Sequence, residues 1–179
     1  MADDEGLMSV WFVGVPVTFA ADDEPLVPAD ADVRALRPAD RHVTLVFLGR
    51  VPDGAARRVW RSLPTLRLPV EVHALGWDRF GRSAVALGLS DDDGLLEAAA
   101  TLCHDAAGDV VVDRRRPAVF RPHVTMARVP RRGRPPTERD LRRWLVPSSA
   151  LQVGRPTLFR SNPRSTGDRY EVVEQQRRG

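Results

Sequence analysis

The chain has 179 residues, of which 42% are hydrophobic and 28% are charged, as in an ordinary globular protein. A single cysteine excludes an internal disulfide, and no stretch approaches the roughly 18 apolar residues that a membrane span needs. Residues 1–6 are acidic and polar and show no targeting pattern. We therefore expect a soluble cytoplasmic protein with one domain over residues 1–179 and a flexible tail at 1–6.

The charge is unevenly distributed along the chain. Every basic residue is an arginine, and the net charge is only +3. Residues 1–50 carry 4 arginines and 9 acids, and residues 51–113 carry 6 and 10, whereas residues 114–179 carry 17 and 5. The last third is therefore +12, which suits a polyanionic partner such as RNA. The alternative interpretation is a solvated arginine-rich surface.

The first half of the chain predicts alternating strands and helices. Strands are expected at Leu7–Val17 and His42–Gly49, with a short helix near Ala29–Leu36 between them. Asp53–Leu63 has helical spacing of its apolar residues. Val70–Trp77 and Ser83–Ser90 read as a strand pair joined by a turn at Phe80–Arg82.

The second half repeats much of this order. Asp91–Gly108 is the clearest helix, with an acidic first turn and a glycine stop, and Cys103 is expected on its core-facing side. A strand over Val119–Val129, a short helix over Thr137–Leu145 and final strands at Leu151–Ser161 and Arg169–Gln175 follow. Interspersed elements with short turns predict an α+β fold with an antiparallel or mixed sheet.

Two strands carry the same polar pattern. In a strand, residues two apart share a face, so His42 and Thr44 point one way, and His123 and Thr125 do the same in the second strand. Two such strands facing each other would place two imidazoles and two hydroxyls around one cavity. The alternative is that each histidine is an ordinary hydrogen-bonded core residue, which is what we expect of His73 and His104.

The paired "HVTL" and "HVTM" resemble the twin HxTx motifs of the 2H phosphoesterase superfamily. Together with "FVGVPV", "RHVTLVFLG", "RPHVTMAR" and "LFRSNPRSTGDRYEVV", they resemble the bacterial RNA 2',3'-cyclic phosphodiesterases, formerly called 2'-5' RNA ligases. The resemblance covers roughly residues 8–174. It implies two similar α+β lobes related by a pseudo-two-fold axis, with the active site in the cleft between them.

The chemistry of this motif suits opening of a cyclic phosphate. Histidine exchanges protons near neutral pH, so one imidazole can activate water while the other protonates the departing oxygen. Threonine hydroxyls can hydrogen-bond the charged phosphate oxygens, so we assign Thr44 and Thr125 to phosphate binding. The resemblance implies that His42 is the general acid and His123 the general base.

Four further residues are candidates. The family often has an arginine at the position of Arg128, but an odd offset from His123 points it to the opposite face unless the strand bulges. Arg121 lies at an even offset and is a second phosphate-binding candidate. Phe12 and Tyr170 are candidates for stacking on a base, or else core residues.

The sequence leaves three functions open. The first is metal-independent hydrolysis of RNA or nucleotide 2',3'-cyclic phosphate ends to 2'-phosphates. The second is 2'-5' RNA ligation, and the third is a non-catalytic module that binds RNA ends through the basic last third. No residues stand at metal-ligand spacing, so we expect no metal and no cofactor, and we expect a monomer without a membrane partner.

Overall fold

The computed structural model describes residues 8–29, 31–110, 119–162 and 168–177. The strands in chain order are β1 (Ser9–Thr18), β2 (Arg34–Ala35), β3 (His42–Val51), β4 (Val70–Val72), β5 (Ala74–Phe80), β6 (Ala84–Leu89), β7 (His123–Arg128), β8 (Leu151–Val153), β9 (Thr157–Ser161) and β10 (Tyr170–Gln175). The α-helices are α1 (Asp53–Ser62), α2 (Leu95–Ala107) and α3 (Glu138–Leu141), and short 3-10 turns lie at Pro38–Asp40 and Gly108–Val110.

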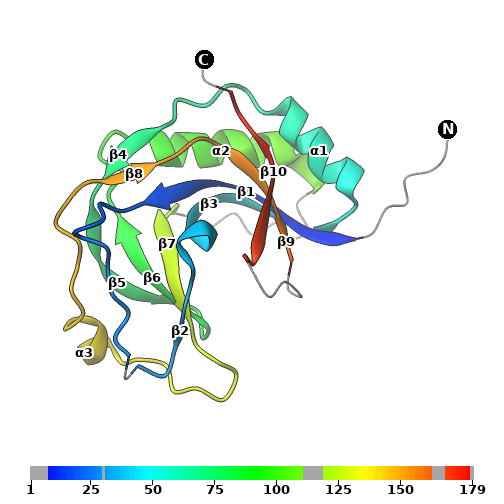
Figure 1. Cartoon of the computed structure of the whole chain (residues 1–179). Coiled ribbons are helices and arrows are strands. Elements are labelled where there is room, and N and C mark those ends of the chain that lie inside the picture. The colour runs from blue at the N-terminus through cyan, green and yellow to red at the C-terminus, as the bar shows by residue number, and fades with distance from the viewer. Residues whose placement is uncertain (1–7, 30, 111–118, 163–167, 178–179) are drawn as a thin grey trace.

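One curved sheet contains all ten described strands (Figure 1). Its main order is β10-β9-β1-β3-β7-β6-β5, and every strand pair in the described residues is antiparallel. The strands with the two histidine motifs, β3 and β7, are therefore neighbours at its centre. They pair only at Val43 and Val124. The α+β class is confirmed, and the two expected lobes correspond to the two halves of this sheet.

The two faces of the central strands differ in chemistry. Val43, Leu45, Val124 and Met126 are buried in the main core, where α1 and α2 cover the sheet (Figure 1). The histidines and threonines that alternate with them are only partly buried. Strand alternation thus buries one face under helices and leaves the other to form the site.

The long helix is confirmed. α2 spans Leu95–Ala107 with Gly94 as its N-cap residue, and the carboxylate of Asp91, three residues earlier, accepts the free backbone amides of Leu96 and Glu97. Gly108 follows with a φ of 47°, a positive value that glycine adopts without strain. Cys103 is fully buried on this helix, and burial raises the pKa of its thiol to about 12.

The prediction of a short helix near Ala29–Leu36 is wrong. Arg34 and Ala35 instead form β2, which pairs with Arg128 and Ala127 of β7. The amide of Leu36 continues this contact by donating to the carbonyl oxygen of Met126. The edge of β7 offered more backbone hydrogen bonds than an isolated turn of helix between prolines could supply.

Two expected strands are each divided. The predicted strand Val70–Trp77 splits at His73 because β4 pairs with β8 whereas β5 pairs with β6. Leu151–Ser161 splits into β8 and β9 at residues 154–156. The short helix predicted at Thr137–Leu145 is confirmed only over its first turn, where Thr137 and Asp140 form a capping box.

No helix among the described residues is long and apolar enough to cross a membrane.

Candidate active site

The two histidines meet in one cleft of about 470 Å³ on the open face of the sheet. His42 and Thr44 reach it from β3, and His123 and Thr125 reach it from β7. Arg128 also lines it. The remaining lining residues are Val10, Phe12, Phe47, Phe80, Ala84, Ser161, Arg169 and Tyr170. The structure therefore brings together the paired motif that the sequence placed on two strands.

Both imidazoles are oriented by the same backbone contact. Nδ1 of His42 lies 2.8 Å from the carbonyl oxygen of Asp40, and Nδ1 of His123 lies 2.8 Å from the carbonyl oxygen of Arg121. A carbonyl only accepts, so each Nδ1 carries a proton and donates. In the neutral ring the lone pair is then on Nε2, which is the nitrogen available to accept or deliver a proton in the cleft.

Burial and positive charge favour the neutral form of both rings. The pKa of His42 is lowered to about 4, chiefly by burial; the hydrogen bond to Asp40 opposes this shift, and the charges of Arg128 and His123 add to it. Burial also lowers the pKa of His123, helped by Arg121 and Arg128 and opposed by its own carbonyl contact and Asp78. An anionic ligand would reverse part of this effect.

A bulge in β7 brings Arg128 into the site. Ala86 pairs with Thr125 and Val85 with Ala127, so Met126 has no partner on β6. The extra residue resets the alternation, and Arg128 lines the cleft together with His123 despite its odd offset. Its Nε is buried and makes no hydrogen bond to any residue that the structure describes. An anion bound here would supply the missing acceptor.

β3 has a bulge at the equivalent place. Gly14 pairs with Thr44 and Val13 with Val46, so Leu45 has no partner on β1. Phe47, five residues after His42, therefore faces the cleft as Arg128 does five residues after His123. Its side chain is 48% exposed. The sequence analysis missed Phe47, although the matching offset of five residues was a usable signal.

Close approach of β1 to β3 requires glycine beside His42. A Cβ atom at Gly14 would lie 2.7 Å from the carbonyl oxygen of Val43 and 3.5 Å from Cδ2 of His42. Any other side chain would push the two strands apart or displace the imidazole.

An aromatic cluster packs around His42. Its ring stacks on Phe12 at 4.5 Å between centroids, and Tyr170 meets it edge-on at 4.9 Å. Phe12 is only 3% exposed and also packs on Phe159 at 4.9 Å. This burial fits the alternative interpretation of Phe12 as a core residue, here packed on His42, and its role in stacking on a base stays a prediction. Tyr170 lines the cleft, and its role in stacking on a base stays a prediction.

Asp40 connects this cluster to the C-terminal strand. The residue is 4% exposed, and its carboxylate accepts the backbone amides of Arg169 at 2.7 Å and Tyr170 at 3.1 Å. Its own carbonyl holds His42. One residue thus fixes both the imidazole and the segment that carries Tyr170 and Arg169, and the sequence analysis missed both Asp40 and Arg169.

Arg121 does not bring its guanidinium into the cleft. The guanidinium pairs with Asp78 at 2.8 Å and lies 5.3 Å from the centre of the Phe80 ring. Phe80 in turn stacks on His123 at 3.7 Å. The ion pair with Asp78 of β5 holds the long side chain outside this cleft, and the phosphate-binding role of Arg121 stays a prediction. Arg121 supports His123 through its backbone carbonyl and through Phe80.

A second cavity adjoins the cleft. It has a volume of about 430 Å³ and shares Thr44, Phe47, Phe80 and His123 with it. Phe120 and His104 extend its lining. This apolar space beside the polar cleft suits a flat apolar group.

Among the described residues, no group of three or more histidine, cysteine, aspartate or glutamate side chains could hold a metal ion. The chemistry that the cleft residues themselves offer is proton transfer by two imidazoles next to hydroxyl and guanidinium donors.

Comparisons with solved structures identify the fold. The crystal structure of Escherichia coli LigT complexed with 3'-AMP superposes with a TM-score of 0.70 at 17% identity, covering 94% of this chain and 97% of LigT. TT0787 of Thermus thermophilus gives 0.67 at 18% identity, covering 93% and 96%. A protein described as a phosphoesterase gives 0.65 at 16% identity, covering 94% and 97%.

The chain has the LigT fold. This confirms the architecture that the motif resemblance implied. LigT has also been crystallised with phosphate, ATP and NADP+. No protein-family model matches the chain, and no curated protein sequence does.

Proposed function

We propose that the protein is a 2H phosphoesterase that opens 2',3'-cyclic phosphate ends of RNA or nucleotides to 2'-phosphates without a metal. The observation that carries the proposal is the pair of imidazoles held by equivalent Nδ1 contacts in one cleft with Thr44, Thr125 and Arg128. Binding alone would not require two oriented histidines. The nucleotide complexes of LigT, which has the same fold, support this substrate class.

The reaction needs one proton acceptor and one proton donor. Neutral His123 accepts a proton from water at Nε2 while the water oxygen bonds to phosphorus. The bond from phosphorus to the ribose 3' oxygen breaks, and protonated His42 delivers its Nε2 proton to that oxygen. The product is a 2'-phosphate with a free 3'-hydroxyl. At the end of the reaction His42 has lost one proton and His123 has gained one.

The surrounding groups stabilise the charge on phosphorus. Arg128 has a buried Nε without a partner in the described residues, and the threonine hydroxyls stand on the same face. These donors are arranged before the substrate binds, so they need little reorganisation as charge develops on the phosphate oxygens. The substrate anion also raises the pKa of the nearby histidines, which supplies the protonated acid.

The apolar side of the site suits the nucleobase. Phe47 and Phe80 line both the cleft and the adjoining cavity, and Phe47 is well exposed. Stacking on such rings tolerates any base. We therefore expect weak discrimination among the four 2',3'-cyclic nucleotides.

The decisive experiment measures hydrolysis of 2',3'-cyclic nucleotides in EDTA and assigns the phosphate position in the product by phosphorus NMR. We expect full activity and a 2'-phosphate. Loss of activity on chelation, restored by a divalent ion, would overturn the metal-independent mechanism. A 3'-phosphate product would reverse the assignment of the leaving oxygen.

Ligation would use the same site with an RNA 5'-hydroxyl in the place of water. The 5' oxygen would then bond to phosphorus as the 3' oxygen leaves, which forms a 2'-5' linkage. RNA with a 2',3'-cyclic phosphate should therefore be incubated with a 5'-hydroxyl RNA in the same assay. Binding of cyclic-phosphate RNA without turnover would instead favour a non-catalytic module.

A further inference from the structure

The candidate active site contains two arginines and no acid. Among the described residues that line the cleft, Arg128 and Arg169 are the arginines, and no aspartate or glutamate accompanies them. A 2',3'-cyclic phosphate carries a single negative charge. Arg128, whose buried Nε has no partner in the described residues, suits that charge. The charge of Arg169 therefore remains for a second anionic group of the same ligand.

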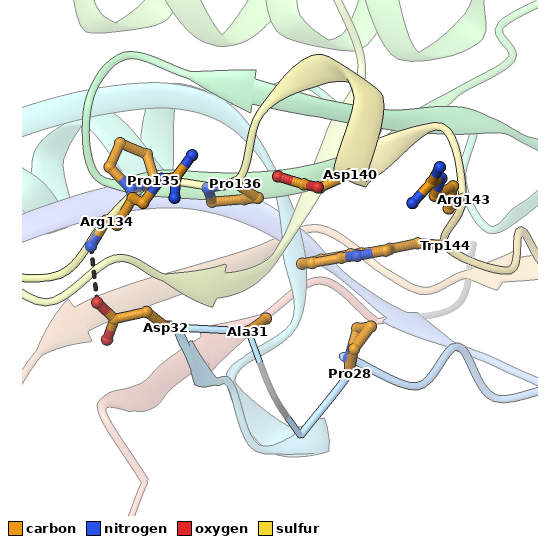
Figure 2. Close-up of a pocket in the computed structure, with 9 residues that line it drawn as sticks. All are labelled: Pro28, Ala31, Asp32, Arg134, Pro135, Pro136, Asp140, Arg143 and Trp144. Atoms are coloured by element: carbon orange, nitrogen blue, oxygen red, sulfur yellow. Dashed lines mark hydrogen bonds between the residues drawn. The ribbon is translucent and has the colours of Figure 1, made fainter.

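The charge balance of the cleft differs from that of a polar pocket elsewhere in the molecule. That pocket has a volume of about 510 Å³ and is lined by Arg134 and Arg143 but also by Asp32 and Asp140 (Figure 2). Figure 2 shows Asp32 bound to Arg134, whose backbone amide donates to the carboxylate at 2.7 Å. The lining of this pocket is neutral, so it has no excess charge for an anion. The cleft has such an excess.

The backbone of Arg169 is fixed, whereas its side chain can reach a ligand. Its amide donates to the carboxylate of Asp40 at 2.7 Å, and its carbonyl oxygen accepts the amide of Asn162 at 2.8 Å. The guanidinium carbon lies 6.0 Å from the centre of the Tyr170 ring. Residue 169 is exposed, and its guanidinium forms no ion pair with a residue that the structure describes.

The two acids nearest to Arg169 in the sequence pair with other arginines. Asp168 pairs with Arg37 at 3.8 Å, and Glu171 pairs with Arg160 at 2.8 Å. Neither carboxylate therefore neutralises the guanidinium of Arg169. Its charge is available to an anion that enters the cleft.

Arg169 lies on the side of the cleft that His42 occupies. Its guanidinium approaches the ring of Tyr170, and this ring meets the imidazole of His42 edge-on at 4.9 Å between centroids. Arg128 and His123, in contrast, reach the cleft from β7. The two arginines of the cleft therefore come from different sides of it.

The stereochemistry of the proposed reaction brings a second phosphate to the side of His42. In that reaction His42 protonates the 3' oxygen, so the C3' atom of the ribose lies next to His42 when the bond to phosphorus breaks. C3' is bonded to C4', which carries the 5' carbon and the 5' oxygen. The base is attached at C1', on the side of the 2' oxygen. A phosphate on the 5' oxygen thus branches from the ribose on the side where Arg169 stands.

We propose that Arg169 binds a phosphate group on the 5' oxygen of the nucleotide that carries the cyclic phosphate. The guanidinium offers several N–H donors to the oxygens of this group, while Arg128 holds the cyclic phosphate. In RNA the group is the last phosphodiester, and in a free nucleotide it is a 5'-monophosphate. The inference rests on the proposed function. It makes Arg169 a residue that determines substrate preference, outside the proton-transfer machinery.

The test compares three substrates that end in adenosine 2',3'-cyclic phosphate: the form with a 5'-hydroxyl, the form with a 5'-phosphate, and a dinucleotide. In the wild-type protein, KM should be lower for the two substrates with a phosphate on the 5' oxygen. In Arg169→Gln, the ratio of KM for each of these two to KM for the 5'-hydroxyl form should rise about 5-fold, the effect of losing one solvent-exposed charged contact. Unchanged ratios overturn the proposal.

The variant should fold, because the contacts of Arg169 with Asp40 and Asn162 are made by its backbone. Circular dichroism checks this. Arg58→Gln is the matched control: it removes an exposed arginine from α1, on the other face of the sheet, and should keep the wild-type ratios. An equal rise of the ratios in Arg58→Gln would overturn the proposal, because the preference would then follow from net charge alone.

The three substrates also separate the two sources of the phosphate. A preference for the dinucleotide that is lost in Arg169→Gln assigns the contact to RNA. A preference for the 5'-phosphorylated nucleotide alone, lost in the same variant, assigns it to a free nucleotide. If none of the three substrates were turned over, the proposed function would fail. Turnover of all three with the same KM ratios in wild type and Arg169→Gln would refute the role of Arg169 and leave the proposed function standing.

Discussion

The two halves of the candidate active site share a backbone arrangement and differ in the side chains placed on it. On β3 and on β7, a histidine bonds a carbonyl two residues earlier, a threonine follows at two residues, and a bulge comes next. The residue five positions after the histidine then faces the cleft. It is Phe47 on β3 and Arg128 on β7.

This difference shows how two half-sites with the same backbone arrangement can bind a substrate in a single orientation. Two equivalent imidazoles could each serve as acid or base. Under the proposed function, the arginine on one side would attract the phosphate, while the phenylalanine on the other offers an apolar surface. The substrate would then enter in one orientation, and that orientation would decide which histidine meets water and which meets the leaving oxygen.

Removing either imidazole should have the largest effect. We expect His42→Ala and His123→Ala each to reduce kcat by about 10²–10⁴-fold, because each deletes one of the two proton-transfer groups. The assay is hydrolysis of a 2',3'-cyclic nucleotide, with circular dichroism to confirm folding. Near-wild-type turnover in either folded variant would refute the two-histidine mechanism.

The next test changes the two residues that distinguish the half-sites. Arg128→Gln should lower kcat by about 10²-fold, the cost of losing one donor to a charged transition state. Phe47→Ala should leave kcat nearly intact and raise KM about 5-fold or more, because it removes a stacking surface. Steady-state kinetics separate the two outcomes. If both variants changed the same parameter, the two half-sites would not differ as we infer.

The pH profile tests the burial of both rings. The active free enzyme holds one proton on the pair, and both pKa values are lowered, that of His42 to about 4. The profile of kcat/KM should therefore be bell-shaped, rise as the pH falls below about 6.5, the value from which both pKa values are lowered, and fall again near about pH 4. Bound phosphate raises both pKa values, so the profile of kcat should extend to higher pH. A flat profile between about pH 5 and 8 would contradict acid-base roles for these residues.

The smallest expected effects compare the two residues whose carbonyls hold the histidines. Asp40→Ala removes a buried acceptor of two amides and should cost about 1–3 kcal/mol of stability, with a lower kcat as His42 loosens. Asp40→Asn keeps an acceptor oxygen and serves as the conservative control. Arg121→Ala keeps its carbonyl, so kcat should stay within a few-fold of wild type.

Thermal unfolding and the pH profile complete this comparison. Removing the charge of Arg121 should move the pKa of His123 upward, since that charge lowers it. An unchanged melting temperature in Asp40→Ala would show that the contacts of this carboxylate contribute little. A large loss of kcat in Arg121→Ala would show that its side chain acts directly on the substrate.

Local patterns predicted a large part of this molecule. The period of two along a strand placed each histidine with its threonine and each valine with the core, because side-chain alternation is a property of the backbone alone. The helix ending at Gly108 was predicted for the same reason, since helical spacing and the glycine stop are local. The architecture was expected from the resemblance of the paired motif to that of the 2H phosphoesterase superfamily, and the likeness to LigT confirms it.

Tertiary structure decided what depends on a neighbouring strand. Only the pairing of β7 with β6 created the bulge that turns Arg128 toward the cleft, and only β1 did so for Phe47. Asp78 drew Arg121 away, and surrounding rings buried Phe12. The helix expected near Ala29–Leu36 became a strand because β7 offered backbone partners. The local sequence determines which side chains of a strand share a face. The register of the strand, its bulges and the charged partners of its side chains depend on segments that are far away in the chain.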